Sequence, residues 1–157
     1  NDYQPPLSQL IHRFKFSGHA ELASTLARLL LLAVRQRTDL PAPVQLISVP
    51  LWQRRHWRRG YNQSELLCRA LARGLHADYQ PRALTRIRPT ATQHQLSARL
   101  RKHNLKNAFQ LELPVHDRHM VIVDDVVTTG STVAEISRLL LRNGAASVQV
   151  WCLCRTL

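Results

Sequence analysis

Apolar residues near the start of the chain recur at helical spacing, which predicts two helices. A first helix is predicted over residues 7–16, because four apolar side chains share one face: Leu7, Leu10, Ile11 and Phe14. A longer helix is predicted over residues 20–37 by the same spacing, which is set by Leu22, Leu26, Leu29, Leu30 and Ala33. The two helices together form an N-terminal helical segment.

The next segment reads as a strand followed by a helix. Residues 44–49 are mostly apolar and predict the first core strand, which ends at a proline. A helix is predicted over residues 62–73, with Asn62 as its N-cap and Glu65 as the capping partner three residues later. Gly74 is expected just past the end of this helix, where glycine commonly terminates one.

Weaker patterns follow between this helix and the last third of the chain. A short strand is predicted at residues 83–87, and residues 105–113 look extended. Residues 88–96 are polar and contain a proline, so we expect a mobile loop there, followed by a short helix over residues 98–103 that Ser97 caps.

The clearest element is a buried strand near the C-terminus. Met120 to Val123 are continuously apolar, as in a parallel strand that is covered on both faces. A helix is predicted over residues 134–142 and ends at Asn143-Gly144, and residues 147–153 predict a final strand. Strands that alternate with helices indicate an α/β fold with a parallel sheet and right-handed crossovers.

Two carboxylates and a loop rich in hydroxyls lie between that strand and its helix. Asp124 and Asp125 fall where the strand is expected to emerge, and Thr128, Thr129, Gly130, Ser131 and Thr132 follow. Backbone N–H groups at a helix start bind phosphate, and carboxylates accept hydrogen bonds from sugar hydroxyls or hold Mg²⁺ through water. The stretch therefore predicts a site for a phosphorylated sugar; the alternative is an acid pair that merely caps the helix. A Walker-type nucleotide site is disfavoured, because no glycine in the chain is followed by lysine.

A strongly basic segment follows the first predicted strand. It carries Arg54, Arg55, Arg58 and Arg59, interleaved with Trp52 and Trp57. Ligands of open parallel sheets bind outside the carboxyl ends of the strands, so this segment and the acid pair are expected at one edge. Guanidinium groups there suit phosphate oxygens. The alternatives are a solvated basic turn, or a nucleic-acid surface where tryptophan stacks on bases.

Composition narrows the class of protein. The 157 residues correspond to one domain, and the net charge of +12 favours anionic partners such as nucleic acid or polyphosphate. The longest apolar run, residues 29–34, is too short to span a membrane, and we find no signal segment. Three cysteines make neither a disulfide framework nor a zinc site and indicate reduced thiols in a cytoplasmic protein. Because the first residue is Asn rather than Met, we expect a fragment or a processed form.

The acid pair and its loop resemble the phosphoribosyl-pyrophosphate (PRPP) loop of type I phosphoribosyltransferases. The resemblance narrows to the ComF family of competence-associated proteins, in its enterobacterial GntX-like branch, through Arg59-Gly-Tyr-Asn-Gln63 and, in family order, Thr92-Gln93, Leu96-Ser97, Arg101, Asn104 and Ala108-Phe109. It covers nearly the whole chain. It implies a parallel sheet of about five strands with flanking helices. It also implies a helical hood over residues 1–40 and a PRPP-binding core over residues 44–157. The N-terminal cysteine-rich, zinc-binding segment of the family has no counterpart in this chain.

The resemblance also assigns roles to residues. Asp124 and Asp125 would contact the ribose 2′ and 3′ hydroxyls as the catalytic pair, and Val127 to Thr132 would hold the 5′-phosphate. The arginine segment would bind the pyrophosphate, and the flexible loop that closes over PRPP would carry Thr92, Gln93, His94 and Arg101. No residue is expected to bind metal directly; Mg²⁺ would arrive with PRPP and lie near the acid pair.

We therefore expect a protein that binds Mg²⁺·PRPP in the use or uptake of DNA. If it is catalytic, the expected reaction is the transfer of phosphoribosyl to a nitrogen acceptor with release of pyrophosphate. No segment specifies the acceptor. The alternatives are a non-enzymatic component that binds nucleotides or single-stranded DNA, and a regulator that senses PRPP. His56 and His94 lie in the two expected ligand loops and are candidate contacts, and we expect no insertion into a membrane.

Overall fold

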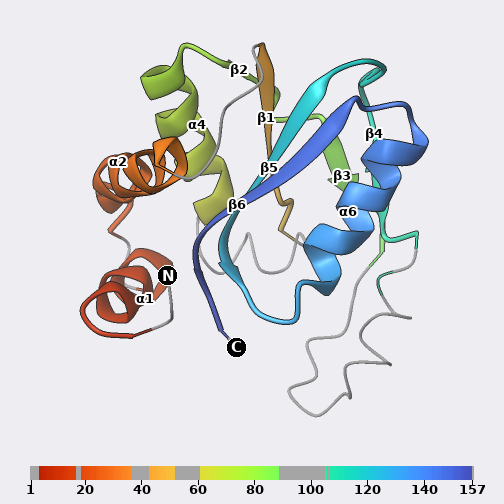
Figure 1. The fold of residues 1–157 in the computed structure, drawn as a ribbon. Coiled ribbons are helices and arrows are strands. Elements are labelled where there is room, and N and C mark those ends of the chain that lie inside the picture. The colour runs from red at the N-terminus through yellow and green to blue at the C-terminus, as the bar shows by residue number, and fades with distance from the viewer. Residues whose placement is uncertain are drawn as a thin grey trace.

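The computed structural model has a four-stranded parallel sheet at its centre, in the strand order β2-β1-β5-β6. The structure describes residues 4–16, 19–36, 43–51, 61–88, 105 and 107–156. The strands of the sheet are β1 (Val44–Ser48), β2 (Asp78–Tyr79), β5 (His119–Val127) and β6 (Ser147–Arg155). Figure 1 shows helices α1, α2 and α4 on one side of the sheet and helix α6 on the other.

Each face of the sheet is covered by its own hydrophobic cluster. Val121 and Val123 of β5 belong to the cluster with α1, α2 and α4, whereas Met120 and Ile122 belong to the cluster with α6. Successive side chains of a strand point to opposite faces, so a strand that is covered on both faces must be apolar throughout. This is why the continuously apolar pattern correctly predicted a buried central strand.

Strand β5 is longer than its apolar run. Its pairing with β1 ends at Ser48↔Val123, but its pairing with β6 continues to Val127↔Arg155. The prediction that the strand ends before the acid pair is therefore wrong: Asp124 and Asp125 lie within β5, where only β6 flanks it. The two carboxylates are satisfied there by Ser64, by backbone N–H groups and by Lys15.

Four helices are described, and their positions follow the predictions closely. They are α1 (Leu7–Phe16), α2 (Leu22–Arg35), α4 (Gln63–Leu75) and α6 (Ser131–Arg142). Ile11 and Phe14 of α1 are fully buried, as the spacing predicted. Helix α6 begins three residues earlier than its apolar pattern, at Ser131. It ends at Asn143, and Gly144 follows with a positive φ of 86°.

The termini of α4 correct two details. Asn62 is the N-cap as predicted, but Glu65 forms an ion pair with Arg69 at 2.7 Å in place of the expected capping contact. Gly74 lies inside the helix, and the left-handed residue that ends it is His76, with φ 52°. A Cβ on Gly74 would lie 3.3 Å from Leu31 Cδ2 of α2, so this glycine serves the close packing of two helices.

Of the short strands between α4 and β5, two do not join the parallel sheet. Strands β3 (Leu84–Arg86) and β4 (Phe109–Leu111) pair antiparallel with each other as a separate sheet. The connection from β2 to β3 covers only residues 80–83, which is too short for the crossover that a parallel neighbour needs. The two-residue strand β2 was missed by the sequence analysis. The described parallel sheet thus has four strands where the resemblance implied about five.

No helix in the described ranges is long and apolar enough to cross a membrane.

Candidate functional site

The acid pair lies at the edge of the sheet where the parallel strands end. Strand β1 stops at Ser48, and the Val49 N–H donates to the Val123 carbonyl at 3.1 Å, immediately before the pair. Figure 1 shows α1 beside this same end of the sheet, near the C-terminus of the chain. The site is thus at the carboxyl edge, where open parallel sheets bind their ligands.

Asp124 is held by two donors on one of its carboxylate oxygens. Its Oδ1 accepts from the Ser64 hydroxyl at 3.1 Å and from the Asp125 N–H at 3.0 Å. Burial, and next the charge of Asp125, raise the pKa of Asp124 to about 7, and the two hydrogen bonds and Lys15 oppose the rise only in part. In the described part of the chain no hydrogen bond reaches Oδ2, so that oxygen can accept one from a ligand.

Asp125 is engaged through both of its carboxylate oxygens. Its Oδ1 accepts from the Val126 N–H at 2.7 Å, and its Oδ2 lies 3.2 Å from Lys15 Nζ. The residue is 8% exposed, whereas the Lys15 side chain is 19% exposed. The two carboxylates therefore have unlike surroundings: a neutral hydroxyl beside one and an ammonium beside the other.

The turn before α4 brings the end of α1 to the acid pair. The Tyr61 hydroxyl donates to the Phe14 carbonyl at 2.6 Å, and Gln63 Nε2 donates to the Lys15 carbonyl at 3.4 Å. Sequence reasoning missed both Lys15 and Ser64 as parts of the site. A signal was present, because Tyr61 and Gln63 belong to the motif that carried the family resemblance.

The loop after β5 places hydroxyl groups at the start of a helix. Gly130 has a φ of 71° and directly precedes α6, and Thr128 and Thr129 are exposed. The Thr129 hydroxyl lies 3.0 Å from the hydroxyl of Ser131, the first residue of α6. An α-helix leaves its first N–H groups without intrahelical partners and carries about half a positive charge at that end. The loop therefore presents hydroxyls and N–H groups together, and their binding of a phosphate stays a prediction.

The predicted pyrophosphate-binding arginines, Arg54, Arg55, Arg58 and Arg59, lie outside the described residues, so their position stays a prediction. The two ends of their segment are described. Asn62 Nδ2 donates to the Val49 carbonyl at 3.1 Å, and Ser64 reaches Asp124, so the segment begins and ends beside the acid pair. The flexible-loop residues Thr92, Gln93, His94 and Arg101, as well as His56, also lie outside the described ranges.

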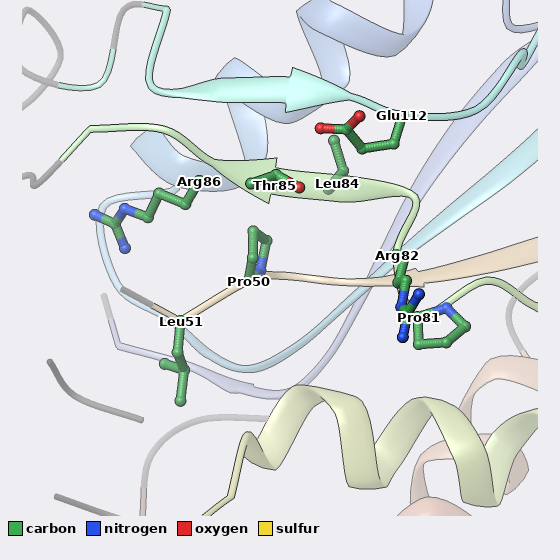
Figure 2. Close-up of a pocket in the computed structure, with 8 residues that line it drawn as sticks. All are labelled: Pro50, Leu51, Pro81, Arg82, Leu84, Thr85, Arg86 and Glu112. Atoms are coloured by element: carbon green, nitrogen blue, oxygen red, sulfur yellow. The ribbon is translucent and has the colours of Figure 1, made fainter. Parts of the chain in front are cut away.

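A broad, open depression adjoins the beginning of the arginine segment. It has a volume of about 460 Å³ and is lined by Pro50, Leu51, Pro81, Arg82, Leu84, Thr85, Arg86 and Glu112. Figure 2 shows the guanidinium groups of Arg82 and Arg86 near opposite ends of β3. Asp124 and Asp125 do not line this depression, so the depression and the acid pair are two separate sites on the described surface.

Residues 62–157 match the model of the phosphoribosyl transferase domain. The chain belongs to this family. The match begins at the N-cap of α4 and contains the acid pair, the loop before α6 and the whole of β6. The resemblance noted in the sequence is thereby confirmed.

Curated relatives place the chain among the ComF-like members of the family. It is 71% identical to the DNA utilization protein YhgH of Escherichia coli K12 over an alignment of 159 positions, which covers 99% of this chain and 70% of that protein. It is 48% identical to competence protein F of Haemophilus influenzae, covering 98% of this chain and 69% of that one. Competence protein ComFC of Bacillus subtilis is 27% identical, with 98% of this chain and 62% of that one covered.

Solved structures confirm the predicted fold class. The allosteric regulatory enzyme of purine biosynthesis superposes with a TM-score of 0.57 at 21% identity, over 85% of this chain and 26% of that one. Glutamine PRPP amidotransferase from B. subtilis, complexed with ADP and GMP, gives a TM-score of 0.50 at 22% identity, over 85% and 25%. This phosphoribosyltransferase-like chain spans about a quarter of each enzyme, and the likeness establishes its fold.

The oxygen atoms at the acid pair fit Mg²⁺ that is brought by a ligand. Mg²⁺ prefers oxygen donors and usually keeps several waters, with one or two carboxylates and substrate phosphates as its other partners. Asp124 Oδ2 offers such an oxygen, and Asp125 Oδ2 does so next to Lys15. No group of three or more His, Cys, Asp or Glu side chains that could hold a metal ion occurs in the described ranges, so a closed protein cage for the ion is absent there.

Proposed function

We propose that this protein binds Mg²⁺·PRPP and transfers its phosphoribosyl group to a nitrogen nucleophile with release of pyrophosphate. One observation carries the proposal: an acid pair, with Asp125 buried and Asp124 partly buried, and an open, hydroxyl-bearing helix start lie on one strand–loop–helix unit at the carboxyl edge of the sheet. The first suits a ribose diol and the second suits a phosphate, as the two ends of a ribose 5-phosphate require. The family membership of the chain supports the same ligand.

In this proposal the described residues orient the sugar. Asp124 and Asp125 accept hydrogen bonds from the 2′ and 3′ hydroxyls, and Val127 to Thr132 surround the 5′-phosphate. Positive charge develops at the anomeric carbon as pyrophosphate departs, and the two carboxylates stabilise that charge. Mg²⁺, when bound with PRPP, supplies charge neutralisation at the phosphates.

Two further predicted segments complete the site. The pyrophosphate is assigned to Arg54, Arg55, Arg58 and Arg59, and the loop with Thr92, Gln93, His94 and Arg101 is assigned to the exclusion of water. The cytoplasm is the proposed location, since Cys68, Cys152 and Cys154 are all free thiols, as expected in a reducing compartment.

The double substitution Asp124→Asn with Asp125→Asn tests the proposal. We expect it to abolish detectable binding of Mg²⁺·PRPP in titration calorimetry while the protein remains folded. Each lost charged hydrogen bond should cost about 1.5–3 kcal/mol, which is roughly ten- to a hundredfold in affinity.

A matched control is Asp117→Asn, which removes an exposed carboxylate in the turn before β5, at the opposite end of that strand. The affinity of Asp117→Asn for Mg²⁺·PRPP should equal that of the wild type. Unchanged affinity in the double variant would remove the acid pair from the site. Transfer itself is tested by a pyrophosphate-release screen with PRPP against nucleobases and simple amines.

A second candidate function is the binding of single-stranded DNA, which the basic depression favours. Arg82 and Arg86 line it, Arg88 is exposed beyond β3, and the net charge is +12. Titration of an oligonucleotide across salt concentrations separates the two functions. DNA affinity should fall steeply with salt through counterion release, whereas PRPP affinity should depend on Mg²⁺.

A further inference from the structure

We infer that Lys15 is a ligand-binding residue: its ammonium serves as the built-in counter-charge of the acid pair and donates to a phosphate oxygen of the bound sugar. The inference rests on the proposed function and adds a residue of α1 to the site. The geometry that carries it is the 3.2 Å contact from Lys15 Nζ to Asp125 Oδ2.

The position of Lys15 suits contact with an anion. In the described ranges it is the only cation within ion-pair distance of either Asp124 or Asp125. An ammonium group has three N–H donors, and Asp125 Oδ2 accepts from one of them. The Lys15 side chain is 19% exposed, so part of it reaches solvent although most of it is enclosed.

Charge explains why the site needs this residue. PRPP is a polyanion, and it must approach two adjacent carboxylates that alone would repel it. One ammonium between them and the ligand offsets part of that repulsion, in a partly buried place where screening by salt is weak. Asp124 Oδ2 remains an acceptor for the ribose, and the net negative charge that the phosphates meet falls.

The attachment of α1 does not depend on the ion pair. Ile11 and Phe14 are fully buried, and the Tyr61 hydroxyl holds the Phe14 carbonyl at 2.6 Å. Gln63 Nε2 donates to the backbone carbonyl of Lys15, and a substitution of the side chain leaves this contact in place. The Tyr61–Gln63 turn thus places residue 15 at the acid pair through groups other than its own charge. An ion pair that served only to attach α1 would not need these hydrogen bonds and apolar contacts beside it.

The experiment compares Lys15→Met, Lys15→Arg and Arg13→Met with the wild type. Titration calorimetry with Mg²⁺·PRPP should show affinity ten- to a hundredfold weaker for Lys15→Met, because one charged hydrogen bond is lost. Lys15→Arg should recover part of the loss. Arg13→Met removes the same charge from an exposed position of the same helix, and it should stay within about threefold of the wild type, as expected for a screened surface charge.

The ligand-free melting temperature is the second readout. It should fall only modestly in Lys15→Met, since Asp125 loses its counter-charge while α1 stays held by apolar burial and neutral hydrogen bonds. Wild-type affinity in Lys15→Met would overturn the inference and leave the proposed function intact. A large fall in the ligand-free melting temperature would also overturn it, because Lys15 would then serve the fold. A wild-type protein that binds no PRPP would refute the proposed function and this inference with it.

Discussion

Asp124 combines a polar task with a desolvated position. Its carboxyl group accepts from Ser64 and from the backbone, yet burial and the adjacent Asp125 raise its pKa to about 7. A raised pKa means that the folded state holds the proton more tightly than the unfolded chain does. At neutral pH the fold therefore carries a cost at this residue, as is common for groups at functional sites.

This cost predicts a pH dependence of stability. As the pH rises from the unfolded value of 3.8 through about 7, the folded state loses its advantage in proton binding, so the free energy of unfolding should fall. Asp124→Asn cannot ionise, and above pH 7 it should be more stable than the wild type by on the order of 2–4 kcal/mol. Urea unfolding at several pH values measures the difference.

At each pH, the free energy of unfolding of Asp124→Asn is compared with that of the wild type, so that contributions common to both proteins cancel. Asp117→Asn, in an exposed turn, is the matched control and should leave the profile unchanged. A difference between Asp124→Asn and the wild type that stays constant from pH 4 to pH 8 would contradict the raised pKa.

At the scale of elements, Asn62 joins β1 to α4 at the edge of the site. Its side-chain oxygen accepts from the Ser64 N–H at 3.1 Å and caps α4, while its Nδ2 donates to the Val49 carbonyl. The residue is 8% exposed, so both partners lose a buried hydrogen bond if the side chain is removed. The cap thereby fixes where α4 begins relative to the end of β1.

Asn62→Ala should lower the free energy of unfolding by about 2–3 kcal/mol, which combines a lost cap with a buried carbonyl left unpaired. Asn62→Ser is the matched variant, because its hydroxyl oxygen can still cap α4 while the donor to the Val49 carbonyl is lost. We expect it to fall between Asn62→Ala and the wild type in urea denaturation. Equal stability of all three proteins would show that the junction contributes nothing.

At the scale of the whole molecule, charge opposes folding. A net charge of +12 on 157 residues destabilises the compact state through self-repulsion, and salt screens that repulsion. The free energy of unfolding should therefore rise as NaCl increases from about 0.05 to 0.3 M, since the Debye length shortens to below about 10 Å. Urea unfolding at each salt concentration measures the rise.

KCl serves as the control for this salt series, since screening does not depend on which monovalent cation is used. Equal curves in the two salts would indicate screening by the ionic atmosphere. A free energy of unfolding that falls with either salt over this range would contradict the prediction.

The sequence by itself determined the elements whose signals are local. Helix α1, the N-cap Asn62, the buried run of β5 and the end of α6 at Asn143-Gly144 each follow from neighbouring residues, through side-chain period or cap chemistry. The acid pair and the loop that follows it were found for the same reason, because they are contiguous. The predicted capping contact of Glu65 with Asn62 was wrong, because Glu65 pairs with Arg69 one helical turn further on.

Only the tertiary structure decided what lies beside the acid pair. Lys15 and Ser64 reach Asp125 and Asp124 from helices that are distant in sequence, and no periodicity encodes such a meeting. The extension of β5 beyond β1 depends on its pairing with β6, and the separation of β3 and β4 depends on the length of a connection. The local sequence determines which chemical groups a segment carries, whereas tertiary packing determines which of these groups come into contact. The charge balance at the acid pair depends on such a contact, between Lys15 and Asp125.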